Sequence, residues 1–225
     1  MHGPEFQFLK SIDVLAGLDD HLIRFLASRL HKKGFKRGEH VFFQGDAVSQ
    51  FYFLEMGRVE IYKSDVDGRK LTLWFIEPRG VFCLATLHSP TAFASARVVE
   101  DAMTYTIEKK ELDAFVAQSG EIATRLVQCM SKKMATYSSM LEDMTFKGTT
   151  SRLARVLLEY QKKDQPSGAT VCALSQGELA ALVGSCREVV ARSLKRLRDE
   201  GVVSSQPQSR LLVIEQPDRL KALCE

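Results

Sequence analysis

The feature that most restricts how this chain can fold is a pair of helix-start signals, ten residues apart, near its C-terminal end. Ser175 is followed three residues later by Glu178, which is the pattern of a capping box that satisfies the first free N–H groups of a helix. Ser185 and Glu188 repeat this pattern. Gly184 lies between the two expected helices and allows the positive φ that a tight turn needs. Two helices joined by such a turn predict a helix-turn-helix motif.

The residues around these signals agree with two helices that cross closely. Ala180 is small enough for the helices to approach each other, and the apolar residues expected between them are Val183, Val190, Leu194 and Leu197. The polar face of the second helix carries Arg187, Glu188, Arg192, Lys195 and Arg196. A mostly basic face of this kind is typical of a recognition helix that enters the major groove of DNA.

Three of these side chains have the chemistry to read base edges. Arg can donate two hydrogen bonds to guanine, and Glu can accept one from the amine of cytosine. We therefore expect Arg187, Glu188 and Arg192 to be the base readers. Two plainer alternatives stay open: Glu188 as a cap alone, and Arg196 with Arg198 as a solvated face.

The residues after the second helix predict a wing. Gly201 ends the helix, and the apolar runs 202–203 and 211–214 can pair as a short hairpin with residues 206–210 at its tip. The tip residues, Arg210 among them, are suited to contact phosphates. Such contacts fix the register of a protein on DNA without reading its sequence.

The N-terminal part of the chain predicts a helix followed by a β domain. Residues 19–31 place apolar side chains at helical spacing behind Asp19, an acceptable N-cap. From about Gly34 to Glu108, runs rich in β-branched and aromatic residues indicate strands: HVFFQ, QFYFLEM, RVEIYKS, KLTLWFIE and MTYTIEK. Regularly spaced glycines in turn-like settings punctuate them: Gly45, Gly57, Gly68 and Gly80. Many short strands with regular turns favour a sandwich or jelly roll.

Residues 112–146 return to helical periodicity. Their apolar residues follow each other at steps of four and three: Ala123, Val127, Met130, Met134, Tyr137, Leu141 and Met144. A heptad pattern this long predicts a homodimer interface made by the six residues from Val127 onward; the alternative is a long helix packed on its own sheet. Residues 146–148 then interrupt the pattern as a hinge, and residues 151–160 resume as a helix.

Composition and charge exclude several classes of protein. Five scattered cysteines without CxxC spacing fit reduced thiols rather than a disulfide framework or a zinc site. No apolar run reaches the length of a membrane span and the N-terminus lacks a secretory signal, so we expect a cytoplasmic protein. From Lys147 onward, 13 Lys and Arg stand against 9 Asp and Glu, so positive charge gathers near the expected DNA reader. No nucleophile with its base is evident, and we do not expect an enzyme.

With these motifs the chain resembles the Crp/Fnr superfamily of bacterial transcription regulators over nearly its whole length. Its spaced glycines resemble those of the family's β-roll, residues 110–146 resemble its dimerisation helix, and VGSCREVVARSLKRL resembles its recognition segment. The resemblance implies an α+β fold in three parts. They are an effector-sensing β-roll, or double-stranded jelly roll, in 1–111, a dimerisation helix with its hinge in 112–146, and a winged helix-turn-helix in 147–225.

The resemblance also implies a function. It describes a homodimer on a palindromic DNA operator, controlled by an effector that moves the hinge, with RNA polymerase as a further partner. It assigns base reading to Arg187, Glu188 and Arg192. Contacts with phosphates or the nearby backbone fall to Gln176, Ser185 and Lys195. A ligand-binding module without specific DNA readout is the alternative function.

The effector region departs from the family members that bind cyclic AMP. Those members carry a Gly-Glu-Leu turn that holds the ribose and an Arg-Ser pair whose Arg clamps the phosphate. The matching stretch GVFCLATLHSPTAFASARVV has no Glu, and Ala94-Ser95 replaces the pair. A buried phosphate without a paired cation is costly, and strand alternation turns Arg97 to the opposite face. We therefore expect an effector other than cyclic AMP; a cyclic-nucleotide-type ligand in an altered pocket is the alternative.

The residues expected around the effector are largely apolar: Phe82, Cys83, Leu84, Leu87, His88, Met130, Met134 and Tyr137. In this the chain resembles haem-dependent sensors of CO and NO and the regulators of hybrid-cluster protein genes. Haem is thus the cofactor candidate, with Cys83 or His88 as its axial ligand; a buried core thiol and a loop histidine are the alternative. No iron–sulfur cluster is expected, because Cys83 is the first cysteine. Cys186, at the start of the recognition helix, is a candidate redox-sensitive thiol.

Overall fold

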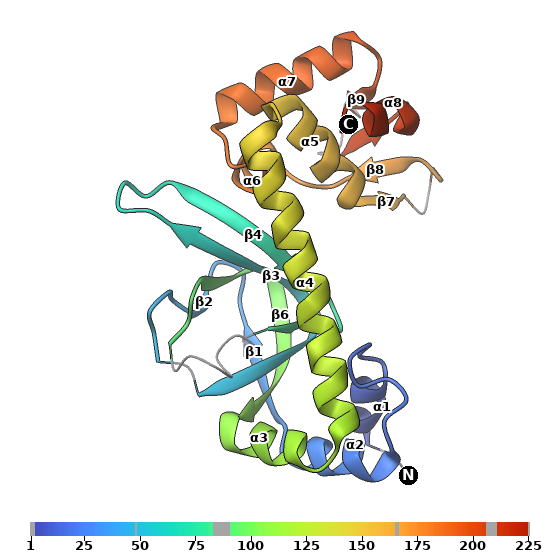
Figure 1. Ribbon diagram of the computed structural model, residues 1–225. Coiled ribbons are helices and arrows are strands. Elements are labelled where there is room, and N and C mark those ends of the chain that lie inside the picture. The colour runs from blue at the N-terminus through green and yellow to red at the C-terminus, as the bar shows by residue number, and fades with distance from the viewer. Residues whose placement is uncertain (1–2, 48, 83–90, 165–166, 206–210, 225) are drawn as a thin grey trace. The chain divides into compact units, whose positions relative to one another are not determined.

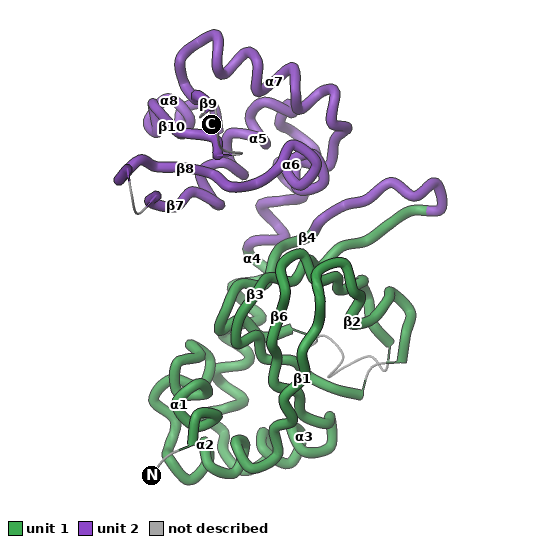
Figure 2. Tube along the Cα trace, turned by 180° about the vertical axis from the view of Figure 1, so that it is seen from behind, with its two compact units in different colours: residues 1–65, 73–135 green, residues 66–72, 136–225 purple. Residues whose placement is uncertain are grey.

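The computed structural model describes residues 3–47, 49–82, 91–164, 167–205 and 211–224. The chain divides into two compact units, residues 1–65 with 73–135 and residues 66–72 with 136–225 (Figure 2). The longest helix, α4 (Gly120–Phe146), runs across the division between them. None of the described helices is both long and apolar enough to cross a membrane.

The first unit is built on an antiparallel sheet with the strand order β1-β6-β3-β4 (Figure 1). Its strands are β1 (His31–Phe35), β2 (His40–Phe42), β3 (Gln50–Ser64), β4 (Lys70–Ile76), β5 (Val81–Phe82) and β6 (Ser95–Glu108). The long strand β6 pairs with β1 near its C-terminal end and with β2 near its N-terminal end. The strand β6 thus pairs with three strands, since it also pairs with β3, and the expected β-roll within an α+β fold is confirmed.

Strand β3 differs from expectation at Gly57. The sequence predicted two strands with a turn between them, but residues 50–64 form one strand whose register shifts on either side of Gly57. The φ of Gly57 is 86°, and a Cβ there would lie 2.2 Å from the carbonyl oxygen of Asp101. The glycine is therefore needed for close approach to β6 at a bulge, which bends the strand without ending it.

A second turn also differs from expectation. Gly45 and Gly68 have the predicted positive φ, 90° and 77°, but at residues 79–80 the positive φ belongs to Arg79, at 72°. Gly80 is required for space instead, because a Cβ there would lie 2.6 Å from Cγ2 of Ile76. The prediction of a left-handed Gly80 was wrong by one residue.

Helices cover one side of the roll (Figure 1). They are α1 (Pro4–Lys10), α2 (Asp20–Ala27), α3 (Lys109–Ala117) and the start of α4. The predicted cap of α2 is confirmed, because Asp19 accepts a hydrogen bond of 2.7 Å from the backbone N–H of His21. The helix is shorter than the predicted 19–31 because the chain enters β1 at His31, and α1 was not predicted at all.

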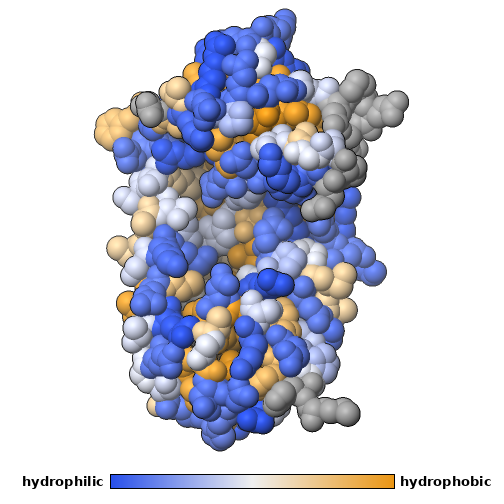
Figure 3. Space-filling model, turned by 90° about the vertical axis from the view of Figure 1, so that its right-hand side faces the viewer, coloured by the Kyte–Doolittle hydropathy of each residue, from blue (hydrophilic) through white to orange (hydrophobic). Residues whose placement is uncertain are grey.

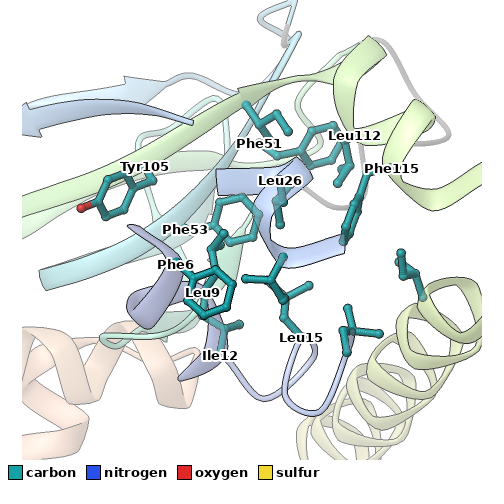
Figure 4. Close-up of a cluster of buried hydrophobic side chains, with 14 residues drawn as sticks. Phe6, Leu9, Ile12, Leu15, Leu26, Phe51, Phe53, Tyr105, Leu112 and Phe115 are labelled. Atoms are coloured by element: carbon teal, nitrogen blue, oxygen red, sulfur yellow. The ribbon is translucent and has the colours of Figure 1, made fainter. Parts of the chain in front are cut away.

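The core beneath these helices joins them to the sheet. Figure 4 shows apolar side chains of α1, α2, α3 and the strands directed toward one another. Ten of them are labelled: Phe6, Leu9, Ile12, Leu15, Leu26, Phe51, Phe53, Tyr105, Leu112 and Phe115, all no more than 5% exposed. Burial on this scale is what holds the short α1 and α2 in helical form, since isolated helices of their length are marginal.

The predicted single helix over residues 112–146 is wrong at its start. The structure has two helices, because α3 ends at Ala117 and α4 begins at Gly120. Ser119 lies between them and its Oγ accepts a hydrogen bond of 3.2 Å from the N–H of Glu121. The heptad pattern lies wholly in α4, where three apolar residues spaced by seven are well exposed: Val127, Met134 and Leu141.

The second unit holds helices around a small four-stranded sheet with the order β7-β8-β10-β9. Besides the end of α4, its elements are α5 (Thr149–Glu159), β7 (Gln161–Lys163), β8 (Thr170–Cys172), α6 (Gln176–Val183), α7 (Arg187–Asp199), β9 (Val203–Ser205), β10 (Leu212–Ile214) and α8 (Pro217–Ala222). Leu153, Val156 and Leu157 of α5 are buried as predicted. The predicted wing hairpin is confirmed in the pairing of β9 with β10, and its tip lies outside the described residues.

Surface hydropathy in both units is mixed. Figure 3 shows hydrophilic residues over most of one face, with hydrophobic residues exposed among them. Single exposed apolar residues are normal on soluble domains. The three on α4 are different because they repeat along one line of a helix, as a helix–helix interface does.

Candidate nucleic-acid interface

The first helix of the motif begins as the sequence predicted. The N–H of Ser175 donates to Oε2 of Glu178 at 2.7 Å, and the N–H of Glu178 donates to Oγ of Ser175 at 3.3 Å. The helix α6 ends at Val183, and its C-cap, Gly184, has a left-handed φ of 64°. The N–H of Ser185 then donates to the carbonyl of Ala180 at 3.0 Å, which closes the turn. The capping box and the tight turn are both confirmed.

The second capping box is wrong. The helix α7 begins at Arg187, so Cys186 rather than Ser185 is its N-cap, and no side-chain hydrogen bond caps it. Glu188 bonds locally in another way: its own backbone N–H and the side chain of Cys186 are hydrogen-bonded to its carboxylate. These bonds, in that order, lower the pKa of Glu188 below its ordinary value. Glu188 is therefore an ionised and exposed acceptor at the start of α7.

The predicted base readers share the exposed face of α7. Arg187, Glu188 and Arg192 are exposed, as is Lys195. The opposite face is fully buried, with Val190, Leu194 and Leu197 each at 0% exposure. The site therefore consists of charged side chains mounted on a helix that its own core holds rigidly.

The remaining predicted contacts lie at the edges of this face. Gln176 is exposed at the start of α6, and Ser185 is half-buried in the turn. A Cβ on Gly177 of α6 would lie 3.6 Å from Nε of Arg187, so the guanidinium of Arg187 crosses the start of α6. Arg210 lies outside the described residues.

The structure adds a feature that the sequence did not predict, an open cavity of about 600 Å³ beside α7. We call it the α5 cavity, and it is lined by Gly148, Thr149, Thr150, Ser151, Val189, Arg192, Ser193, Arg196 and Leu223. Gly148 is the N-cap of α5, has no side-chain cap and is followed by a first turn without an acidic residue. The positive end of this helix dipole thus opens beside Arg192 and Arg196.

The chemistry of the α5 cavity suits a phosphate group. Helix N-termini bind anions through their free N–H groups, and Arg is a strong phosphate donor. Hydroxyl groups add further donors, and Oγ1 of Thr150 lies 3.2 Å from Oγ of Ser193. The sequence predicts residues 146–148 only as a hinge. The missed signal was a glycine followed by three hydroxyl residues at a helix start that carries no acid.

The expected effector region is only partly within the described residues. Cys83, Leu84, Leu87 and His88 lie outside them. Phe82 is buried and stacks on Tyr52 with ring centroids 4.9 Å apart, and Phe42 lies 6.4 Å from Phe82. These rings occupy the space beside Phe82, so the described part of the roll gives no support for a haem there.

The helix α4 residues assigned to the effector occupy different settings. Met130 packs against the core of the first unit that Figure 4 shows. Met134 is 75% exposed. Tyr137 is half-buried, and this burial raises its pKa to about 12, so its hydroxyl stays protonated at neutral pH.

The strand that would clamp a cyclic phosphate carries no cation on its inner side. Ala94 and Ala96 are buried in the roll interior, at 1% and 0% exposure. Arg97 lies on the other face of β6, and its Nη2 is 3.2 Å from Oε2 of Glu60. The predicted orientation of Arg97 is confirmed. Within the described part of the chain, no three His, Cys, Asp or Glu side chains gather as metal ligands.

Two family models match the chain on either side of α4. Residues 32–119 match the cyclic nucleotide-binding domain, and residues 151–223 match the Crp-like helix-turn-helix domain. The first match covers the roll and the second covers α5 to α8 with the wing.

Curated relatives combine both parts. The CRP-like cAMP-activated global transcriptional regulator of Mycobacterium tuberculosis is 25% identical over 211 residues, covering 92% of this chain and 94% of that protein. The anaerobic regulatory protein of Bacillus subtilis is 26% identical over 202 residues, covering 87% of this chain and 85% of that one. Among solved structures, FixK2 from Bradyrhizobium japonicum shares the fold, with a TM-score of 0.77 at 21% identity over 87% of this chain and 98% of that one.

Proposed function

The chain belongs to the Crp/Fnr superfamily of transcription regulators, and from that premise we propose that it binds a two-fold symmetric operator as a homodimer, with α7 as its recognition helix. Its curated relatives are regulators rather than enzymes, and the chain is likewise not an enzyme. The observation that carries the proposal is the row of exposed charged side chains on α7 beside the α5 cavity.

Base reading falls to the exposed first turns of α7. Arg187 and Arg192 can each donate two hydrogen bonds to a guanine, and the ionised Glu188 can accept one from a cytosine. Because the local bonds of Glu188 do not use all its lone pairs, helix-end bonding and base reading are compatible.

Phosphate contacts surround this reader. The α5 cavity supplies a helix N-terminus, hydroxyls and two guanidinium groups for one phosphate of the DNA backbone. Gln176, Ser185, Lys195 and Arg210 are the further contacts that we assign. These contacts orient α7 in the groove and account for salt dependence, while specificity comes from the base readers.

The dimer is assigned to α4. Val127, Met134 and Leu141 expose an apolar line on α4, and Met130, Tyr137 and Met144 complete the heptad. Two-fold pairing through this line would present two recognition helices about one turn of DNA apart. RNA polymerase is the further partner that we propose for the bound regulator. The division into parts 1–111, 112–146 and 147–225 remains our functional division of the chain.

The effector that we propose is not cyclic AMP. The name of the Mycobacterium relative records activation by cAMP, and that property belongs to that protein. Here Ala94 faces the roll interior and Arg97 pairs with Glu60 on the other face. Haem with NO or CO remains a prediction from the sequence, to be tested by the visible spectrum of protein from haem-replete cells. A Soret band that shifts with NO supports haem, and a colourless protein that binds DNA contradicts it.

Fragment selection tests the DNA-binding proposal. The full chain is mixed with sheared genomic DNA at moderate salt, and the retained fragments are sequenced. The expected result is a common sequence with two-fold symmetry. Retention without any common sequence, or none at all, would contradict specific DNA reading.

A further inference from the structure

A buried carboxylate lies at the C-terminal end of α4. Asp143 is only 5% exposed. Nε of Arg155, on α5, lies 2.7 Å from its Oδ2, and Nζ of Lys147 lies 3.6 Å from its Oδ1. We call Asp143, Lys147 and Arg155 the elbow cluster, because they join the last turn of α4 to α5 across the connection between the two helices.

The elbow cluster also reaches the end of the chain. The Nζ of Lys147 donates a hydrogen bond to the backbone carbonyl of Cys224, and the thiol of Cys224 donates to the carbonyl of Leu220 at 3.3 Å. Lys147 is largely buried, with 19% of its side chain exposed. One carboxylate therefore links α4, the connection after it, α5 and the residues that follow α8.

These links adjoin two walls of the α5 cavity. Gly148, which lines the cavity, directly follows Lys147, and Leu223, which lines it from the other end of the unit, directly precedes Cys224. Ser151, also in the lining, lies one helical turn before Arg155 on α5. The backbone amides in the first turn of α5, which line the cavity, are thus positioned by residues that Asp143 contacts.

Stability alone is a weak reason for such a cluster. A buried ion pair generally stabilises a fold no better than apolar residues of the same shape, because both charges lose their water. What a charge pair does supply is a fixed geometry, since the carboxylate accepts only from donors placed around it. A site that must meet a phosphate within hydrogen-bond distance requires that fixed geometry.

We propose that Asp143 is a positioning residue of the DNA interface, which through Arg155 and Lys147 holds the start of α5 where the α5 cavity can receive a backbone phosphate. This inference rests on the proposed function. It also changes the expected hinge: bending at residues 146–148 would break the elbow cluster. The contacts of Asp143 therefore fix the last turn of α4 to α5 in this structure.

Substitutions at both ends of the pair test the proposal in the full chain. Asp143→Asn removes the buried negative charge, and Arg155→Met removes its nearer cation, whose side chain is 38% exposed, while Lys147 stays 3.6 Å from Asp143. Arg155→Lys restores a cation. Glu142→Gln is the matched control, because Glu142 is the neighbouring carboxylate of the same turn and is exposed.

Two measurements are made on each variant. Affinity for a fragment from the selection described above is measured over a series of salt concentrations. We expect Asp143→Asn and Arg155→Met to lose about tenfold in affinity and to flatten the salt slope by about one phosphate contact. Arg155→Lys should recover most of both, and Glu142→Gln should behave as the unchanged protein. Unchanged affinity, or a loss without a change in slope, overturns the proposal.

Hydrogen exchange without DNA separates this inference from the proposed function. The backbone N–H groups of Lys147 and Arg152 donate to the backbone carbonyls of Asp143 and Gly148, at 3.0 and 3.1 Å, at the end of α4 and the start of α5. They should exchange faster in Asp143→Asn and Arg155→Met and normally in Glu142→Gln. If the unchanged protein selects no DNA, the proposed function fails, yet this measurement still decides whether the elbow cluster holds α5. Unchanged exchange in both variants overturns the proposal that the elbow cluster holds the start of α5.

Discussion

The guanidinium of Arg97 lies 3.2 Å from the carboxylate of Glu60, on neighbouring strands and on the face turned away from the interior of the roll. The side chain of Glu60 is 2% exposed and that of Arg97 is 41% exposed. A carboxylate buried so deeply needs a paired cation. Arg97 is therefore committed to a structural contact, while Ala94, just before β6, and Ala96, on the opposite face of β6, are buried in the roll.

This pairing predicts a defined loss of stability. Arg97→Ala should lower the free energy of unfolding by about 2 kcal/mol, less than the roughly 3–5 kcal/mol of a fully buried pair, because water screens the exposed side of Arg97. Glu60→Gln in the same chain should recover part of that loss, because it removes a buried charge that has lost its contact with Arg97. Urea denaturation of the unchanged protein and of these two variants measures both effects. A double variant less stable than Arg97→Ala would contradict the pairing.

Cyclic AMP should not bind the roll through an Arg that pairs with its phosphate. Without a cation on the inner face, calorimetric titration up to about 1 mM, the limit of weak specific binding, should show no saturable heat. Operator affinity should also be unchanged by the nucleotide. The relative from Mycobacterium tuberculosis, named as cAMP-activated, provides the positive control. Saturable binding that Arg97→Ala abolishes would contradict this prediction.

The fold could be predicted from the sequence where a signal is local. The capping box at Ser175 and the left-handed Gly184 depend on residues within one or two turns, and both were predicted correctly. Local signals fail when neighbouring residues compete for one role. Ser185 and Cys186 are both acceptable helix starts, and the closing bond from Ser185 to Ala180 leaves Cys186 as the N-cap.

The α5 cavity could not be predicted because its lining comes from separate segments. Thr150 and Ser193 are 43 residues apart, and no periodic pattern connects them. The elbow cluster is similar, since Asp143 falls outside the apolar heptad and looks like an ordinary solvated acid in the sequence. Its burial follows only from the packing of α5 and the C-terminal segment against the end of α4.

Substitutions on α7 should distinguish residues that read bases from residues that contact phosphates. Arg187→Ala should relax the base preference at one position of each half-site, at a cost of about 1–3 kcal/mol, because it removes two bonds to a base. Lys195→Ala should weaken binding evenly across operator variants and flatten the salt slope, as the loss of a phosphate contact does. Binding of both variants to a panel of single-base operator changes distinguishes them. The same profile for both would contradict the assignment.

The carboxylate of Glu188 should stay ionised, and so remain a hydrogen-bond acceptor, in mildly acidic solution. Its pKa is lowered by hydrogen bonds from its own N–H and then from Cys186, so the ionised form is favoured in the fold. The associated stability is present above the pKa of the unfolded chain and is lost as the pH falls through the lower, folded pKa. Carboxyl NMR titration should give Glu188 a value below that of an ordinary glutamate. Cys186→Ala should raise it only in part, because the N–H bond remains, and no rise would exclude the thiol contact.

The exposed line on α4 should form the dimer interface. Met134 and Leu141 are 75% and 66% exposed, two helical turns apart. Met134→Glu with Leu141→Glu should place like charges opposite each other in a two-fold interface and separate the chains, because like charges repel and apolar burial is lost. Val66→Glu is the control, since Val66 is a fully exposed apolar residue on the hairpin between β3 and β4. Sedimentation equilibrium should give one chain for the double variant and two for the control. If the double variant keeps two chains, the dimer uses another surface; if it separates, operator affinity should also fall, because each half-site must then be bound alone.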